Sequence, residues 1–142
     1  MWKSSSTIEN NTISGNTSNS YGGGIYLYES SLTITGNTIS NNTSGWSGGG
    51  IYLYLSFPTV TNNTIRDNTA LYNGGICVGS NSDLLPATNR PGGWGTGREN
   101  IPIGDPLIPA EGEEYIIAGN TFLGNEHGDP LGYSEGAHVY FH

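Results

Sequence analysis

Residues 22–28 read GGGIYLY, and the same seven residues return unchanged at 48–54, 26 positions later. A shortened copy, GGICV, occupies residues 74–78, and a fourth copy, IIAGNTFLGN, begins at Ile116 after a long interruption. The segments before each copy keep the same interval, because the I-x-x-N-T-I pattern that starts at Ile8 recurs at Ile34. A period of this length is typical of a solenoid, a propeller or another repeat array.

Each repeat holds three short β-type runs, represented by STI, NTI and GGGIYLY. In the third run Ile25 and Leu27 alternate with Tyr26 and Tyr28, so the apolar pair and the aromatic pair face opposite sides of a strand. The Asn, Gly, Ser and Thr residues between the runs favour turns. No window of helical length has apolar residues at helical spacing. The sequence therefore predicts three strands and three turns per coil of a β-solenoid, with coils about 4.8 Å apart.

Stacked coils place equivalent residues above one another, which predicts columns of like side chains. The expected inward columns are Ile8, Ile34 and Val60; Ile13, Ile39, Ile65 and Phe122; Ile25, Ile51 and Ile76; and Leu27, Leu53 and Val78. Asparagines recur at two turns, as Asn11, Asn37, Asn63 and Asn120, and as Asn16, Asn42, Asn68 and Asn125. Stacked Asn amides can hydrogen-bond along the axis, so we interpret both sets as structural ladders.

The pattern I-x-x-N-T-I-x-x-N followed by G-G-G-I-Y-L resembles the right-handed parallel β-helix repeat. It is similar to repeats of the carbohydrate-binding and sugar-hydrolase β-helix domain, of pectate-lyase-like surface proteins and of polymorphic outer membrane proteins. Periplasmic proteins implicated in copper delivery to nitrous oxide reductase have the same kind of repeat. The resemblance covers residues 6–79 and 115–142. It implies an all-β, right-handed parallel β-helix and an exported, extracellular or cell-surface protein.

The boundaries follow from the repeat. We expect a single β-helix domain, or a fragment of one, within the 142 residues, with coils at 6–30, 31–56, 57–79 and 113–142. Residues 80–112 hold five of the seven prolines and predict a long loop rather than a strand. This loop either contacts a ligand or partner, through Trp94 in GGWGTG, or covers a flank of the solenoid. In the fourth coil we expect Ala137 to align with Ile25.

The composition of the chain limits the kinds of partner that it is expected to bind. The net charge of −8, with four basic residues, argues against nucleic acid, whose binding depends on Lys and Arg meeting phosphate. No apolar stretch is long enough to span a bilayer. Residues 1–7 lack the apolar core of a signal peptide, so we expect that a leader was removed or that the chain belongs to a longer one.

The outward tyrosines are the best candidates for a contact surface. Tyr26 and Tyr28 are expected to stack on Tyr52 and Tyr54 as an exposed grid, with Trp46 at the turn before the strand. Rigid amphipathic rings suit sugar stacking or a protein interface. Alternatively, the tyrosine columns only stabilise adjacent strands through cross-strand pairing.

Catalytic signals are weak. Arg66 and Asp67 read as a surface contact, and no nucleophile with an adjacent base is readable. The segment EHGDP, with Glu126, His127 and Asp129, is a weak candidate for a metal site. Cys77 aligns with Tyr26 and is expected to point outward. We therefore expect no catalytic residues, no cofactor and no metal.

Three functions remain open. The first is a structural or adhesive surface module that self-associates end to end into filaments. The second is a carbohydrate-binding module that uses the outward tyrosines Tyr26, Tyr28, Tyr52 and Tyr54, together with Trp94, to bind a polysaccharide. The third is a non-catalytic fragment of a polysaccharide lyase or hydrolase whose active site lies elsewhere.

Overall fold

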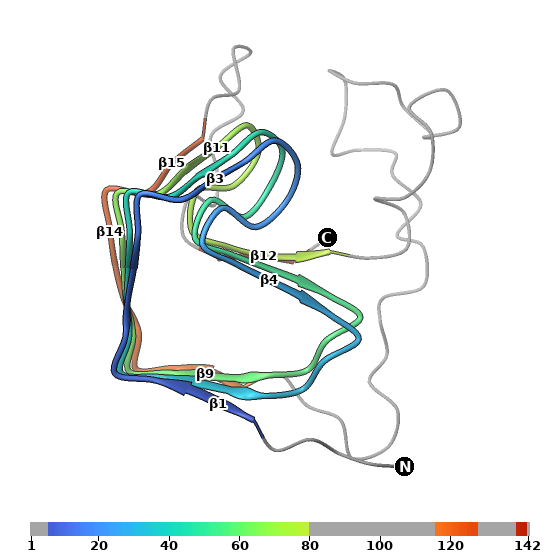
Figure 1. Ribbon diagram of the computed structural model, residues 1–142, viewed down its shortest axis with the longest axis vertical. Helices are drawn as coiled ribbons and strands as arrows, with labels where there is room; N and C mark the ends of the chain where they lie inside the picture. The colour runs from blue at the N-terminus through green and yellow to red at the C-terminus, as the bar shows by residue number, and fades with distance from the viewer. Residues whose placement is uncertain (1–5, 80–115, 128–138, 142) are drawn as a thin grey trace.

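Short strands recur in a fixed order, and the residues that the structure describes contain no helix. The structure is a computed structural model, and it describes residues 6–79, 116–127 and 139–141. Each coil contributes one strand to each of four parallel sheets, which we name A to D in the order the chain visits them. In Figure 1 the coils lie nearly over one another, so the four sheets outline one cross-section.

The strand bounds follow the repeat. Sheet A contains β1 (Thr7–Glu9), β5 (Thr33–Thr35), β9 (Thr59–Thr61) and β13 (Ile116–Ala118). Sheet B contains β2 (Thr12–Ser14), β6 (Thr38–Ser40), β10 (Thr64–Arg66) and β14 (Thr121–Leu123). Sheet C contains β3 (Thr17–Ser18), β7 (Thr43–Ser44), β11 (Thr69–Ala70) and β15 (Glu126–His127). Sheet D contains β4 (Ile25–Tyr28), β8 (Ile51–Tyr54), β12 (Ile76–Gly79) and β16 (Val139–Phe141).

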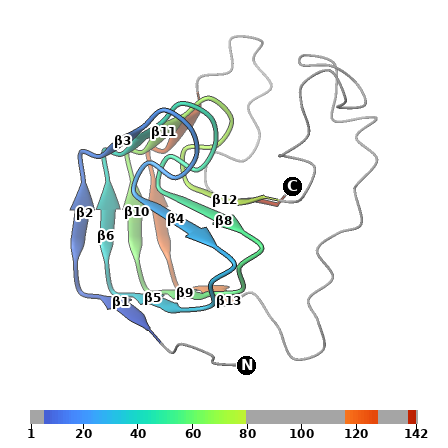
Figure 2. The same ribbon diagram turned by 45° about the vertical axis from the view of Figure 1, so that its right-hand side comes forward.

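The register within the sheets confirms the predicted columns. Ile8 pairs with Ile34, and Ile34 pairs with Val60. The column that starts at Ile13 continues to Phe122 across the interruption. Figure 2 shows the resulting row of parallel strands in sheet B, beginning with β2, β6 and β10. The all-β solenoid predicted from the period of 26 is therefore confirmed.

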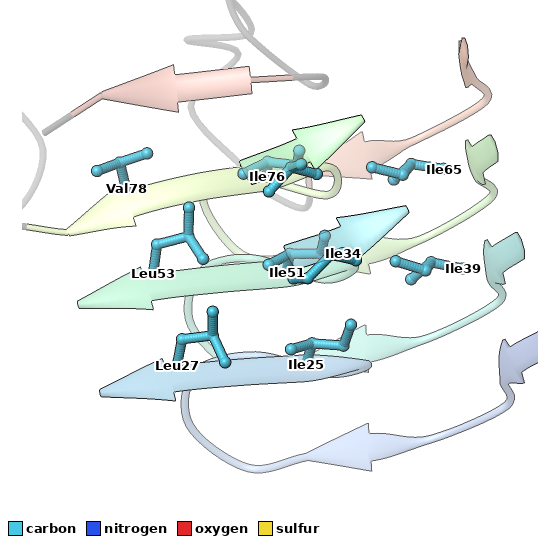
Figure 3. Packing of buried hydrophobic residues seen from close by; sticks show 10 residues of the cluster. Ile25, Leu27, Ile34, Ile39, Ile51, Leu53, Ile65, Ile76 and Val78 are labelled. Carbon is cyan, nitrogen blue, oxygen red and sulfur yellow. The ribbon is translucent and has the colours of Figure 1, made fainter. Parts of the chain in front are cut away.

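Aliphatic side chains fill the interior between sheets A, B and D. Ile34, Ile39, Ile51 and Ile65 are completely buried. In Figure 3 the columns of sheet D, such as Ile25, Ile51 and Ile76, lie one above another and face the isoleucines of the other sheets. Removing this apolar surface from water is the main favourable contribution to folding.

The prediction of three strands per coil is wrong, because each described coil has four. The additional strands are the two-residue strands of sheet C, which begin at Thr17, Thr43, Thr69 and Glu126. They form because the chain continues to pair with the neighbouring coil after the second Asn turn, as in the bond from the Thr43 N–H to the Asn16 carbonyl (2.8 Å). Two residues are too few to show an alternating pattern in the sequence.

The expected alignment of Ala137 with Ile25 is also wrong. In the structure Val139 pairs with Ile76, which itself continues the Ile25 column. The register survives the interruption as far as Glu126, which is equivalent to Thr17. Val139 then follows Glu126 by 13 positions, whereas Ile25 follows Thr17 by 8, so the spacing of the first coil does not locate the last strand of the fourth. The predicted loop at 80–112, including Trp94, lies outside the described residues and stays a prediction.

Two turns use left-handed backbone in every coil. At the turn between sheets A and B these residues are Asn10, Gly36, Asn62 and Gly119; between sheets B and C they are Gly15, Asn41, Asp67 and Gly124. Glycine, asparagine and aspartate tolerate positive φ better than other residues. The first column alternates Asn with Gly because each Asn side chain extends over the glycine of the following coil. A Cβ added at Gly36 would lie 2.7 Å from Asn10 Oδ1.

Candidate functional site

The outer face of sheet D carries the aromatic residues singled out in the sequence. Along β4 the side chains alternate, with Ile25 and Leu27 buried and Tyr26 and Tyr28 exposed by 47 % and 51 %. This alternation follows from the two-residue period of a strand. Tyr26 and Tyr28 therefore lie on the same outer face, supported by a sheet whose other side is the core.

Each exposed ring is backed by a tyrosine of the next coil. Tyr26 stacks on Tyr52 with ring centroids 5.6 Å apart and an interplanar angle of 2°, and Tyr28 stacks on Tyr54 at 5.4 Å and 26°. Tyr21 contacts Tyr52 from the loop before β4, with centroids 4.4 Å apart. Stacked rings gain about 0.5–1.5 kcal/mol beyond their buried area. The exposed pair is therefore held on a rigid support.

The expectation that all four tyrosines are exposed is wrong, because Tyr52 and Tyr54 are only 1 % and 2 % exposed. Tyr52 stands in register between Tyr26 and Cys77, and Tyr21 packs against the same cluster. Cys77 lies in the outer column as expected but is also buried. Tyr26 and Tyr21 pack on Tyr52 from one side, and Cys77 follows it in the next coil. Of the four tyrosines on the outer face of sheet D, only Tyr26 and Tyr28 are therefore accessible.

Tyr26 and Tyr28 have raised pKa values. For Tyr28 the main cause is a hydrogen bond with the Glu29 side chain, followed by repulsion from the charge of that carboxylate. For Tyr26 partial burial raises the pKa by disfavouring the charged phenolate. Both hydroxyls therefore keep their protons at neutral pH, and both can donate hydrogen bonds. Glu29, which sequence reasoning missed, gives this face an acidic side chain next to the rings.

A second aromatic pair lies on the loops between sheets C and D. Trp46 and Tyr72 meet edge to face, with centroids 5.6 Å apart and an interplanar angle of 86°. Their backbones are joined by a hydrogen bond from the Tyr72 N–H to the Trp46 carbonyl (2.9 Å). Tyr72 is 38 % exposed. Trp46 therefore belongs to a separate pair on the loops, while Trp94 lies outside the described residues.

The repeated asparagines form two hydrogen-bonded ladders. In the first, the Asn37 amide donates to Asn63 Oδ1 and the Asn63 amide to Asn120 Oδ1, both at 3.0 Å, while Asn11 joins through its backbone N–H to Asn37 Oδ1. In the second, the same amide-to-oxygen bond links Asn16, Asn42, Asn68 and Asn125 in order. Each amide of a following coil also donates to a strand carbonyl, as Asn63 does to Ile34 (2.9 Å). These side chains are used in holding coils together.

The charged residues considered as metal ligands or as a surface contact do not form a cluster among the described residues. Glu126 is exposed at the start of β15 and pairs in register with Thr69, while Asp129 lies outside the described residues. Within the described ranges, no three His, Cys, Asp or Glu side chains gather where they could hold a metal ion. Arg66 and Asp67 form the expected surface contact, 2.7 Å apart with each side chain 45 % exposed. Such an exposed pair contributes little to stability.

Apolar columns, Asn ladders and stacked short strands define the class of the protein as a parallel β-solenoid. Residues 1–91 match the family described as the right handed beta helix region. Because this match covers more than half of the 142 residues, the chain belongs to that family. The family assignment confirms the resemblance to the right-handed parallel β-helix. Comparisons with curated proteins and with solved structures give no match. No helix of the described residues is long and apolar enough to cross a membrane.

Proposed function

We propose that the chain is a structural and adhesive module of an extracellular or cell-surface protein. The observation that carries this proposal is the use of its repeated polar residues. The ladder asparagines of the two middle coils are buried and hydrogen-bonded to the next coil; they are Asn37, Asn42, Asn63 and Asn68. The repeated polar residues therefore stabilise a stiff stack of coils. In a solenoid each unit contacts only its neighbours, which suits a protein that spans distance and presents a surface.

Surface location can be tested with antibodies against the protein on intact, unpermeabilised cells that produce it. We expect labelling without permeabilisation, and weaker attachment of the cells to surfaces when the gene is deleted. A cytoplasmic protein in the same cells serves as the control for cell integrity. Labelling that requires permeabilisation would exclude the proposed surface role.

An alternative function is polysaccharide binding by the Tyr face, defined here as Tyr26 and Tyr28. Two half-exposed rings on one strand, each backed by a stacked tyrosine, are suited to stacking against the apolar faces of sugar rings. Glu29 and the net charge of −8 favour an uncharged polysaccharide over an acidic one.

For this alternative we expect Tyr26→Ala combined with Tyr28→Ala to reduce retention on an insoluble neutral polysaccharide at least about ten-fold, which corresponds to about 1.4 kcal/mol. Tyr28→Phe keeps the ring and should retain most of the binding. Tyr72→Ala, an exposed tyrosine outside the Tyr face, is the matched control. Equal retention of the double variant and the unchanged protein in a pull-down assay would exclude the Tyr face as the sugar site.

A further inference from the structure

Asn73 has a buried amide nitrogen without a hydrogen-bond partner among the described residues. It lies in the loop between sheets C and D of the third coil and is completely buried. Its Oδ1 accepts from the Gly75 N–H (3.2 Å), but its Nδ2 donates to nothing in the described part of the chain. A buried donor in this state destabilises the fold. The ladder amides differ, since Asn68 of the same coil donates to the Ile39 carbonyl and to Asn125 Oδ1.

The residue that follows Asn73 is glycine, whereas each ladder asparagine of the middle coils is followed by threonine. A backbone nitrogen can attack the side-chain carbonyl carbon of a preceding asparagine and close a succinimide ring. A stiff β-branched side chain hinders this approach, and glycine leaves it open. Packing requires the glycine, because a Cβ at Gly74 would collide with the carbonyl oxygens of Asn68 and Glu126. The fold therefore combines an Asn-Gly pair with an unbonded side-chain nitrogen.

The loop that contains Asn73 lacks a serine that holds the equivalent loop of the second coil. There the Ser44 hydroxyl donates to the Ser47 carbonyl (2.9 Å). In the third coil the residue in register with Ser44 is Ala70, which has no hydroxyl. Side-chain hydrogen bonds therefore restrain this loop less than its neighbour, which favours the small movement that ring closure needs.

Ring closure breaks no hydrogen bond that the described residues make. The Gly74 N–H, which the reaction consumes, donates no hydrogen bond within the described ranges. The Asn73 backbone carbonyl accepts from the Gly49 N–H (2.9 Å), and Asn73 Oδ1 accepts from the Gly75 N–H. Both oxygens remain as carbonyls of the ring. The reaction also removes the unpartnered Nδ2 from the interior, so the folded structure favours the product.

We propose that Asn73 and Gly74 form a self-modification site, at which the folded chain cyclises to a succinimide. The lone pair of the Gly74 nitrogen forms a bond to Asn73 Cγ, and the Cγ–Nδ2 bond breaks with its electron pair. Nδ2 leaves as ammonia and takes up the proton from the Gly74 N–H, so no other reactant is needed. Because the site is closed to water, hydrolysis to aspartate or isoaspartate requires the loop to open. The inference is independent of the proposed surface role.

Peptide mapping by mass spectrometry tests the site. The folded protein is stored at mildly alkaline pH and digested with pepsin in acid, which preserves a succinimide. The peptide that contains Asn73 and Gly74 should lose the mass of one ammonia, in a fraction that grows with time. We expect a rate at least about ten-fold above that at Asn68, which corresponds to about 1.4 kcal/mol in the barrier. Asn73→Gln would need a larger ring and should not lose ammonia.

The chain unfolded in urea is the matched comparison, because water then reaches the ring. There the same peptide should yield aspartate and isoaspartate in place of the succinimide. An Asn73 that stays intact in the folded protein while the unfolded chain reacts would overturn the inference, because the fold would then protect the pair. Equal loss of ammonia at Asn68 would overturn it as well. If Asn73→Gln does not fold, the comparison of Asn73 with Asn68 within the unchanged protein decides.

Discussion

Asn63→Ala is expected to lower the free energy of unfolding by about 3–5 kcal/mol, because it removes a completely buried link between three coils. Asn63 Oδ1 accepts from both the N–H and the amide of Asn37, and the Asn63 amide donates to the Ile34 carbonyl and to Asn120 Oδ1. Alanine leaves the Asn37 N–H without its acceptor in a region closed to water. Each buried group left unsatisfied costs about 1–3 kcal/mol.

The matched control is Asn11→Ala in the same ladder. Asn11 is exposed, and its amide donates only to the Glu9 carbonyl of its own coil (2.8 Å), so water can replace the lost bond. We expect a loss below about 1 kcal/mol. Urea denaturation measures both variants, provided the slope of free energy against denaturant stays constant. If both substitutions cost the same, the ladder bonds would not be what holds the coils.

The difference between these two asparagines could not be derived from the repeat alone. The sequence places Asn11 and Asn63 in one column and predicts a ladder, and the structure has one. The repeat length and the alternation determine the column of a residue, because coils of constant length stack residues 26 positions apart above one another. Burial depends on how many coils lie on each side of a residue, so equivalent positions in one column differ in energy.

The tyrosines illustrate the same limit. Alternation in IYLY places Tyr52 on the outer face correctly, but an outward direction is not the same as exposure. Tyr52 is covered by Tyr26, Tyr21 and the following coil, and only the first-coil pair stays accessible. Glu29 was missed because it is a single turn residue after the strand, in left-handed conformation (φ 45°), and its equivalent one repeat later is Leu55 (φ 48°), so no acidic residue recurs at this position.

Errors of register have a different physical origin. Sheet C was missed because strands such as Thr17–Ser18 are held by pairing between coils, and their local sequence has no strand pattern. Val139 was misplaced because it follows Glu126 by 13 positions, whereas the equivalent Ile25 follows Thr17 by 8, so the spacing of the first coil does not hold in the fourth. Both features depend on contacts between distant segments, which a local pattern does not encode.

Gly49→Ala is expected to cost about 4 kcal/mol or more, or to prevent folding, because the added methyl group has no space. Gly49 lies in the loop before β8, where its N–H donates to the Asn73 carbonyl of the next coil (2.9 Å). A Cβ there would lie 2.6 Å from the Thr69 carbonyl oxygen and 2.7 Å from the Gly74 carbonyl oxygen. These are backbone atoms of the following coil, so relief requires the two coils to separate and their hydrogen bonds to lengthen.

Gly15→Ala separates this steric effect from the general cost of replacing a glycine. Gly15 has φ +69°, and a Cβ added there meets nothing within 4 Å. Its substitution should therefore cost only the left-handed strain of about 1–2 kcal/mol. Gly49→Ala has no such strain, and it destabilises the fold because the added methyl group clashes with the backbone of the following coil. Thermal unfolding followed by circular dichroism should rank Gly49→Ala well below Gly15→Ala. The reverse order would mean that the coils can move apart at the GGG loops, and that close backbone stacking there is not what requires glycine in the repeat.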